Sequence, residues 1–240
     1  MGSTRFPGKV LADLCGQPML SVLLHRLRMT SGLDEVVVAT TNHITDDILA
    51  GWLEAQGVSY FRGSENDVLE RYHACAAEKK ADIVVRVTAD DPLKDHEIIE
   101  RALSILTENK AADYVSNTIN PTFPEGLDIE VFNFNALDRA AREATLSSDR
   151  EHVTPYIWRN TSKFNVVNFT MERNLGEWRW TVDKPEDLEF VRAVFSNLGN
   201  NLEVSYREVI KLIENRPELL KINAGTVRNE GYLISLSNEG

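Results

Sequence analysis

The first nine residues of the chain carry the groups that a polyphosphate requires. Gly2 and Gly8 free backbone N–H groups, Ser3 adds a hydroxyl, and Arg5 and Lys9 add two positive charges. Backbone amides and cationic side chains of this kind surround phosphate oxygens in proteins. The spacing differs from that of a P-loop, because no serine or threonine follows the lysine. Composition alone also fits a flexible, charged amino terminus.

Two adjacent carboxylates, Asp90 and Asp91, closely follow a β-branched run at residues 82–87 that is typical of a buried strand. Magnesium usually binds one or two protein carboxylates together with substrate phosphates, so this position suits a metal site. Thr88 adds a hydroxyl to the same loop. The alternative is structural, since Asp-Asp-Pro is also a common turn sequence that can cap the next helix.

Another acidic position, Asp183, stands between a predicted strand and a predicted helix. The residues that follow it, Pro185, Glu186 and Asp187, favour the first turn of a helix. Helix initiation therefore explains Glu186 and Asp187. It leaves Asp183 as the candidate for a second metal ligand.

Three further segments are weaker candidates for a substrate site. Arg62 and Ser64 follow a predicted strand and could contact a base or ribose, although capping of the next helix explains Ser64 equally well. Glu125 and Asp128 could line an acceptor pocket or form an ordinary turn. His152 lies in a predicted helix, where a lone histidine is more often structural, and no triad is evident.

The elements that position these residues alternate between short β-branched runs and longer amphipathic runs. Strands are predicted at 35–40, 58–61, 82–87, 114–118, 129–134, 164–169 and 178–182. Helices are predicted at 45–56, 67–79, 95–106, 135–144, 148–158, 185–196 and 205–214. This order indicates an α/β fold: an open, mostly parallel sheet flanked by helices, with a small irregular β-containing insertion. Ligands of such sheets bind beyond the carboxyl ends of the strands.

The composition excludes several classes of protein. A net charge of −11 argues against a general nucleic-acid binder, which needs a basic surface. No apolar run approaches the roughly 20 residues that a membrane span requires, and no secretion signal is visible. Only two cysteines occur, without metal-ligand spacing, which fits a reducing compartment. We expect a cytoplasmic protein.

Six segments of the chain, taken in order, resemble the cytidylyltransferase (CMP-sugar synthetase) family. The similarity is to its branch of spore-coat polysaccharide biosynthesis F and acylneuraminate cytidylyltransferase-like proteins, whose fold is of the nucleotide-diphospho-sugar transferase type. The matching segments are residues 2–9, 62–72, 86–93, 125–132, 150–156 and 180–188. The resemblance implies one nucleotidyltransferase domain over residues 1–220. A polar tail, residues 221–240, would wrap the domain or fray.

The resemblance also implies roles for the candidate residues. The nucleotide-binding residues would be Gly2, Ser3, Arg5, Lys9, Arg62, Ser64 and Thr88. Lys9, Arg5 and Asp90 would be catalytic, with Mg²⁺ held by Asp90 and Asp183. Glu125, Asp128 and His152 would lie on the acceptor side. The expected reaction transfers CMP from CTP to a hydroxyl of a small sugar or sugar acid, with release of pyrophosphate, in a protein that forms a homodimer.

Two departures from the family pattern leave alternatives open. The family usually begins with a strand and an Ala-Arg-like dipeptide before the residue 2–9 segment, so a first central strand is expected before Met1. Ala89 stands where many relatives have glycine. One alternative is a truncated, non-catalytic nucleotide-binding protein, left by loss of that first strand. The other is a glycosyltransferase that uses a nucleotide-sugar donor, a label that this branch sometimes carries.

Overall fold

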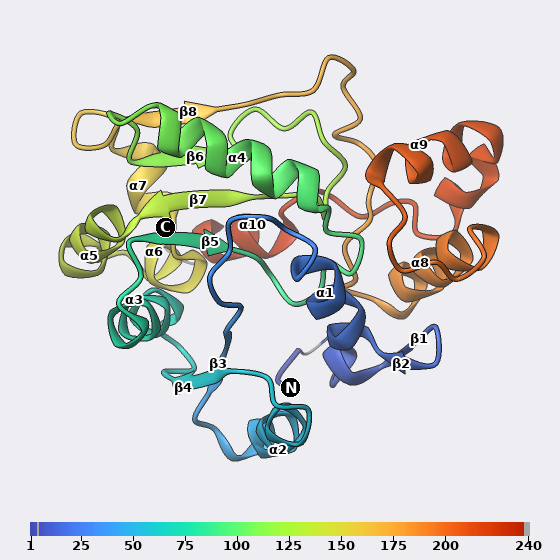
Figure 1. Cartoon of the computed structure of the whole chain (residues 1–240), viewed down its shortest axis with the longest axis horizontal. Coiled ribbons are helices and arrows are strands. Elements are labelled where there is room, and N and C mark those ends of the chain that lie inside the picture. The colour runs from blue at the N-terminus through green and yellow to red at the C-terminus, as the bar shows by residue number, and fades with distance from the viewer. Residues whose placement is uncertain (4, 238–240) are drawn as a thin grey trace.

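The computed structural model of the chain describes residues 1–3 and 5–237 and confirms the predicted α/β fold (Figure 1). The main sheet has the strand order β5-β7-β6-β8. Its strands are β5 (Ile83–Arg86), β6 (Tyr114–Ser116), β7 (Glu130–Asn133) and β8 (Val166–Asn168). β6 and β8 pair in parallel, whereas β7 runs antiparallel to both β5 and β6. Within this sheet, β7 alone therefore opposes the common strand direction.

Two further strand pairs lie outside the main sheet. They are the parallel pair β3 (Val38–Thr41) and β4 (Tyr60–Gly63), and the antiparallel pair β1 (Asp13–Leu14) and β2 (Gln17–Pro18). Among the described residues, no backbone ladder joins β3 or β4 to the main sheet. Backbone pairing thus divides the predicted open sheet into separate parts.

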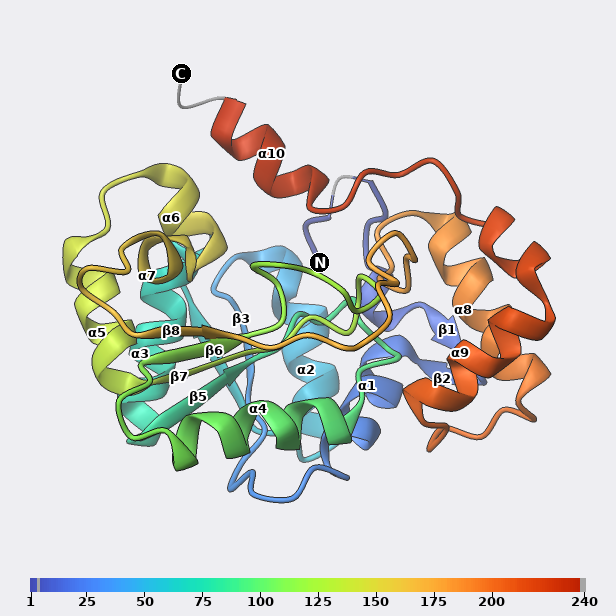
Figure 2. The ribbon, with the colours of Figure 1, turned by 90° about the horizontal axis from the view of Figure 1, so that it is seen from above.

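Helices cover both faces of the main sheet, and the alternation of side chains along its strands explains this. Val115 and Val131 belong to the core cluster that contains α4 (His96–Glu108). Their neighbours Tyr114 and Phe132 belong to a second cluster. That cluster also contains residues of α3 (Val68–Lys79), α5 (Phe134–Glu143) and α7 (Pro155–Arg159). Successive side chains of a strand point to opposite faces, so both faces bury apolar surface. Figure 2 shows α4 on one side of the sheet and α5 and α7 on the other.

The remaining helices complete the domain. They are α1 (Met19–Leu27), α2 (Asp47–Ala55), α6 (Ser147–His152), α8 (Pro185–Asn197), α9 (Tyr206–Asn215) and α10 (Glu230–Ser237). Short 3-10 turns span Lys9–Leu11, Ile44–Asp46 and Pro217–Lys221. Side-chain caps begin several helices: the Asp67 carboxylate accepts from Glu70 N at 2.9 Å before α3, and Ser205 and Glu208 form a capping box at α9.

Two sequence predictions of secondary structure were wrong. The strand expected at 178–182 is reduced to one bridge, between Glu125 and Arg179. The helix expected at 148–158 is divided into α6 and α7 at Val153, whose φ of 74° and ψ of −55° lie in a strained region for a β-branched residue. Thr154 N donates to His152 O at 2.9 Å, which closes a γ-turn. Pro155 then starts α7, a position that proline favours.

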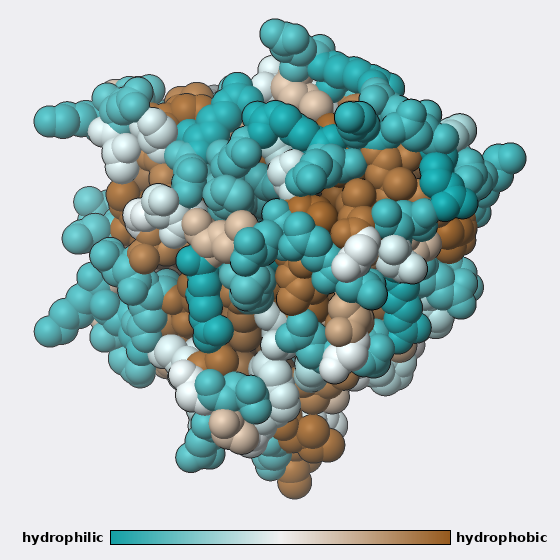
Figure 3. All heavy atoms as spheres, turned by 45° about the vertical axis from the view of Figure 1, so that its right-hand side comes forward, coloured by the Kyte–Doolittle hydropathy of each residue, from teal (hydrophilic) through white to brown (hydrophobic). Residues whose placement is uncertain are grey.

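Polar side chains cover most of the face shown in Figure 3, with separate apolar patches between them. One patch lies at the lower end of that view, over α2, whose Ile48 is 69% exposed. Among the described residues, none of the helices is both long and apolar enough to cross a membrane.

Candidate active site

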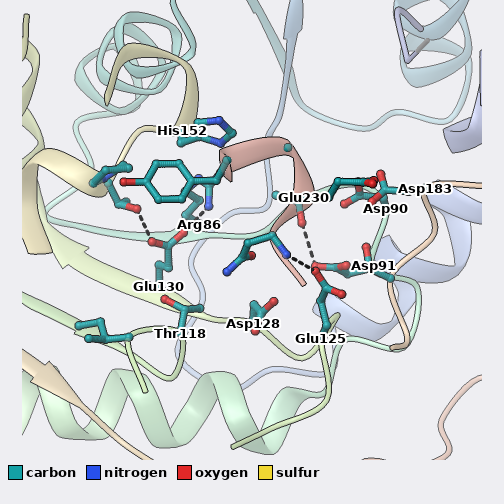
Figure 4. A pocket seen from close by; sticks show the side chains of 18 of the residues that line it. Arg86, Asp90, Asp91, Thr118, Glu125, Asp128, Glu130, His152, Asp183 and Glu230 are labelled. Carbon is teal, nitrogen blue, oxygen red and sulfur yellow. Dashed lines mark hydrogen bonds and ion pairs between the residues drawn. The ribbon is translucent and has the colours of Figure 1, made fainter. Parts of the chain in front are cut away.

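A pocket of about 460 Å³ lies beyond the carboxyl ends of β5 and β6. It is lined by seven of the residues predicted from the sequence, namely Arg5, Thr88, Asp90, Glu125, Asp128, His152 and Asp183. In the view of Figure 4, Asp90 and Asp183 lie at one end, and Arg86 and Glu130 lie at the other. We call these the Asp90 end and the Arg86 end of the pocket.

Lys9 joins the two candidate metal ligands at the Asp90 end. Gly8, with a φ of 72°, turns the chain so that Lys9 begins a 3-10 turn and its side chain is largely buried. Lys9 Nζ donates to Asp90 Oδ2 at 2.8 Å, to Asp183 Oδ1 at 2.9 Å and to Val182 O at 2.8 Å. The structure therefore brings together two aspartates that are 93 positions apart in the printed sequence.

The charges at this end stabilise the ionised forms of their partners. Burial alone would lower the pKa of the Lys9 ammonium, but Asp90 and Asp183 outweigh burial and raise the pKa above its ordinary value. Burial alone would raise the pKa of Asp183, but Lys9, Arg179 and Arg5 outweigh it and lower the pKa. Arg5 Nη2 lies 3.0 Å from Asp183 Oδ1. Lys9 and Arg5 thus both contact Asp183 Oδ1.

Arg179, which was not predicted from the sequence, is a buried residue that holds the carboxylates of the Asp90 end in place. Its guanidinium bonds Glu125 at 2.6 Å, Asp183 at 2.8 Å and Asp187 at 2.9 Å, and the residue is 7% exposed. Asp187 also accepts from the backbone N–H groups of Asp183 and Lys184, both at 2.9 Å, as predicted for a helix start. The signal available was an arginine four residues before the predicted metal ligand.

Asp91 differs from its neighbour Asp90 because it is committed to a buried ion pair. Asp91 Oδ2 accepts from Lys94 Nζ and from Thr88 Oγ1, both at 2.8 Å. Asp91 is 3% exposed and Lys94 is 1% exposed, and burial raises the pKa of Asp91. Asp90 Oδ1, by contrast, forms no hydrogen bond with the described residues. Asp90 is therefore the carboxylate of this loop that is available to a ligand.

The Arg86 end of the pocket is built on a second ion pair. Glu130 pairs with Arg86 and accepts from the hydroxyls of Tyr114, at 2.6 Å, and Thr154. Thr154 directly follows the γ-turn at Val153 and is buried. The sequence analysis missed Glu130, whose partner Arg86 lies on the neighbouring strand.

The three residues predicted for the acceptor side, Glu125, Asp128 and His152, all line the pocket. Asp128 pairs with Arg228, and burial raises the pKa of Asp128 in spite of that partner. Glu125 is fixed by Arg179, and Gly126 after it has a φ of 106°. A Cβ on Gly126 would lie 2.7 Å from Thr181 N, so the turn requires glycine.

Five predicted nucleotide-binding residues do not line the pocket, and one of these, Lys9, contacts the lining residues Asp90 and Asp183. Arg62 pairs with Asp47 at 2.7 Å and donates to Thr41 O at 2.9 Å, while Ser64 Oγ accepts from Asp67 N at 3.1 Å. Ser3 Oγ accepts from Phe6 N at 3.2 Å. Gly2 is exposed. Their roles in nucleotide binding stay predictions.

The donor set at the Asp90 end fits magnesium. Oxygens of Asp90 and Asp183 already converge on one cation, the Lys9 ammonium. In the part of the chain that the structure describes, no group of three or more His, Cys, Asp or Glu side chains could hold a metal ion. Two carboxylates suffice for magnesium when substrate phosphates supply further ligands.

Comparison with known proteins places this geometry in a family. Residues 1–220 match the sequence profile described as Cytidylyltransferase. The chain is 33% identical to the spore coat polysaccharide biosynthesis protein SpsF of Bacillus subtilis, over 91% of the chain and 92% of that protein. It is 29% identical to a 3-deoxy-manno-octulosonate cytidylyltransferase of Rhizobium johnstonii, over 85% of the chain and 83% of that protein.

A solved structure supports the same assignment. A cytidylyltransferase from Leptospira borgpetersenii superposes with a TM-score of 0.88 at 34% identity, covering 95% of each chain. The sequence match and the fold match thus extend over nearly all of the chain. The chain therefore belongs to the cytidylyltransferase family and is a nucleotidyltransferase.

Proposed function

We propose that this protein transfers CMP from CTP to a hydroxyl of a sugar or sugar acid, releases pyrophosphate, and serves polysaccharide biosynthesis. The names of SpsF and of the 3-deoxy-manno-octulosonate cytidylyltransferase support the substrate class. The observation that carries the proposal is the convergence of Lys9, Asp90 and Asp183 at one end of the pocket. Cations and a two-carboxylate metal site are what a nucleoside triphosphate needs there.

The residues act by position and charge, since no covalent intermediate is required. Lys9 and Arg5 offset charge on the phosphates and on the leaving pyrophosphate. Asp90 and Asp183 would hold magnesium, which would polarise phosphate oxygens. The acceptor occupies the remaining length of the pocket and presents its hydroxyl to the α-phosphate for in-line attack. Arg179 is a positioning residue, because it reaches the site only through Asp183 and Glu125.

A pyrophosphate-release assay tests the proposal. CTP, UTP, GTP and ATP are each combined with Mg²⁺ and one of three acceptors: 3-deoxy-manno-octulosonate, N-acetylneuraminate or a neutral hexose. CTP with one of these acceptors is expected to release pyrophosphate. If the protein releases no pyrophosphate from CTP, but releases a nucleoside phosphate from a preformed nucleotide sugar, the proposal is contradicted.

Asp90→Ala is expected to lower kcat by about 10²–10³, the effect of losing one preorganised electrostatic group. Asp138→Ala is the matched control, because Asp138 is also in an ion pair, with Arg142 at 2.7 Å, but does not line the pocket. Near-normal turnover of Asp90→Ala would remove Asp90 from the mechanism.

A further inference from the structure

The C-terminal segment, residues 223–237, lies along the pocket although it is outside residues 1–220 that match the family. Asn229 N donates to Glu125 Oε1 at 3.0 Å, and Arg228 pairs with Asp128. Ser235 Oγ lies 3.0 Å from His152 Nε2. The segment therefore contacts each residue that the sequence predicted for the acceptor side.

The same segment reaches the Asp90 end of the pocket, where the proposed function places the phosphates of the nucleotide. Glu230 pairs with Arg5 at 2.5 Å, and Figure 4 shows Glu230 between His152 and the Asp90–Asp183 pair. One short stretch of chain thus borders both halves of the pocket.

Hydrophobic burial does not explain this position. None of the residues of α10 is buried, and Leu233 and Ile234 are 51% and 54% exposed. A helix that packs for stability alone turns such side chains to the core. The contacts that place α10 are instead polar and aromatic contacts with pocket residues.

Tyr232 supplies an aromatic wall to the pocket. Its ring packs edge to face against the rings of His152 and Trp158, with distances between ring centroids of 5.1 Å and 6.1 Å. All three residues line the pocket. Across from His152 in Figure 4 lie Thr118 and Glu130, which offer oxygen atoms. A sugar ring has an apolar C–H face and a hydroxyl edge, so aromatic rings facing oxygen acceptors complement it.

We propose that the C-terminal segment completes the acceptor half of the site and that Tyr232 is the platform on which the acceptor's sugar ring packs. The inference rests on the proposed function for the presence of a sugar acceptor. It assigns acceptor selection to residues outside the family-matched region.

Steady-state pyrophosphate release tests the role of Tyr232. Tyr232→Ala is expected to raise the acceptor KM about tenfold or more and to leave the KM for CTP within about twofold. Tyr232→Phe keeps the ring and is expected to stay within about threefold of the wild type. Leu233→Ala is the matched control, since Leu233 lies on the same helix and does not line the pocket. Equal acceptor KM values for Tyr232→Ala and Leu233→Ala would overturn the inference.

Hydrogen exchange gives a readout that does not need turnover. Addition of 3-deoxy-manno-octulosonate, N-acetylneuraminate or a neutral hexose is expected to slow amide exchange in residues 226–237 of the wild type, and not of Tyr232→Ala. If pyrophosphate release saturates with one of these sugars while exchange is unchanged, the inference fails and the proposed function stands. If a sugar slows exchange but CTP yields no pyrophosphate, the proposed function fails and the sugar site stands. If neither occurs, both are refuted.

Discussion

Replacing Lys9 with methionine removes the ammonium that holds Asp90 and Asp183 together. The residue is 9% exposed, and its Nζ atom makes three hydrogen bonds of 2.8–2.9 Å. Loss of one partner of a buried ion pair costs about 3–5 kcal/mol. The Asp90 and Asp183 side chains are 24% and 20% exposed, so solvent screening places the loss near the lower limit, at about 3 kcal/mol.

Thermal unfolding in EDTA measures this loss. For a chain of this size, about 3 kcal/mol lowers Tm by about 6–12 °C. Added Mg²⁺ should restore part of the Tm of Lys9→Met, because the two freed carboxylates bind it in the folded state only. The same Mg²⁺ should raise the Tm of the wild type less, since Lys9 already neutralises the site.

Lys79→Met is the matched control. Lys79 Nζ bonds Glu35 at 2.8 Å and Ser59 at 2.9 Å, but at the protein surface, so its Tm should stay within about 2 °C of the wild type. A wild-type Tm for Lys9→Met in EDTA would show that Lys9 does not organise the cluster. An equal response of both proteins to Mg²⁺ would show that Lys9 does not compete with Mg²⁺ for Asp90 and Asp183.

Three further outcomes are expected. Arg179→Met removes the cation that Glu125, Asp183 and Asp187 share and should lower the free energy of unfolding by about 3–5 kcal/mol in urea titrations, while Arg179→Lys should recover only part of it. Gly126→Ala should cost about 2 kcal/mol by backbone collision, whereas Gly51→Ala, in helix α2 with open space around it, should be neutral or stabilising; calorimetry separates them. The lowered pKa of Asp183 means that the stability from its ionisation is present above its ordinary value of 3.8 and lost as pH falls through the lowered value. The unfolding free-energy difference between wild type and Asp183→Asn should therefore be constant from about pH 5 to 8 and shrink in more acidic solution; a difference that grows on acidification would contradict this.

The residues whose location at the pocket could be predicted from the sequence are those whose position follows from local pattern. Asp90 could be placed because it comes just after a strand, and the carboxyl ends of strands border the ligand site of such sheets. Asp183 was separated from its neighbours because proline and acids at a helix start explained the residues after it, and Asp187 indeed caps α8.

The residues that the sequence missed depend on distant partners. Arg228 pairs with Asp128 across 100 positions, and no spacing rule links them. Nor does composition show that a polar tail borders a pocket. Pro155 did signal a break within 148–158, because proline disfavours a helix interior, but the γ-turn at Val153 could not be predicted from the sequence.

Val153 meets two opposing demands. Its backbone angles are those that glycine tolerates, yet its side chain is fully buried in the cluster with Leu137 and Ile157. Strain of this kind persists only when surrounding contacts over-determine it. Packing of Val153 in this cluster therefore sets the direction of the neighbouring residues His152 and Thr154. Leu137 and Ile157 do not line the pocket, but removing a methyl group from either is therefore expected to change the direction of His152 and Thr154, which do, and with it the preference for substrate.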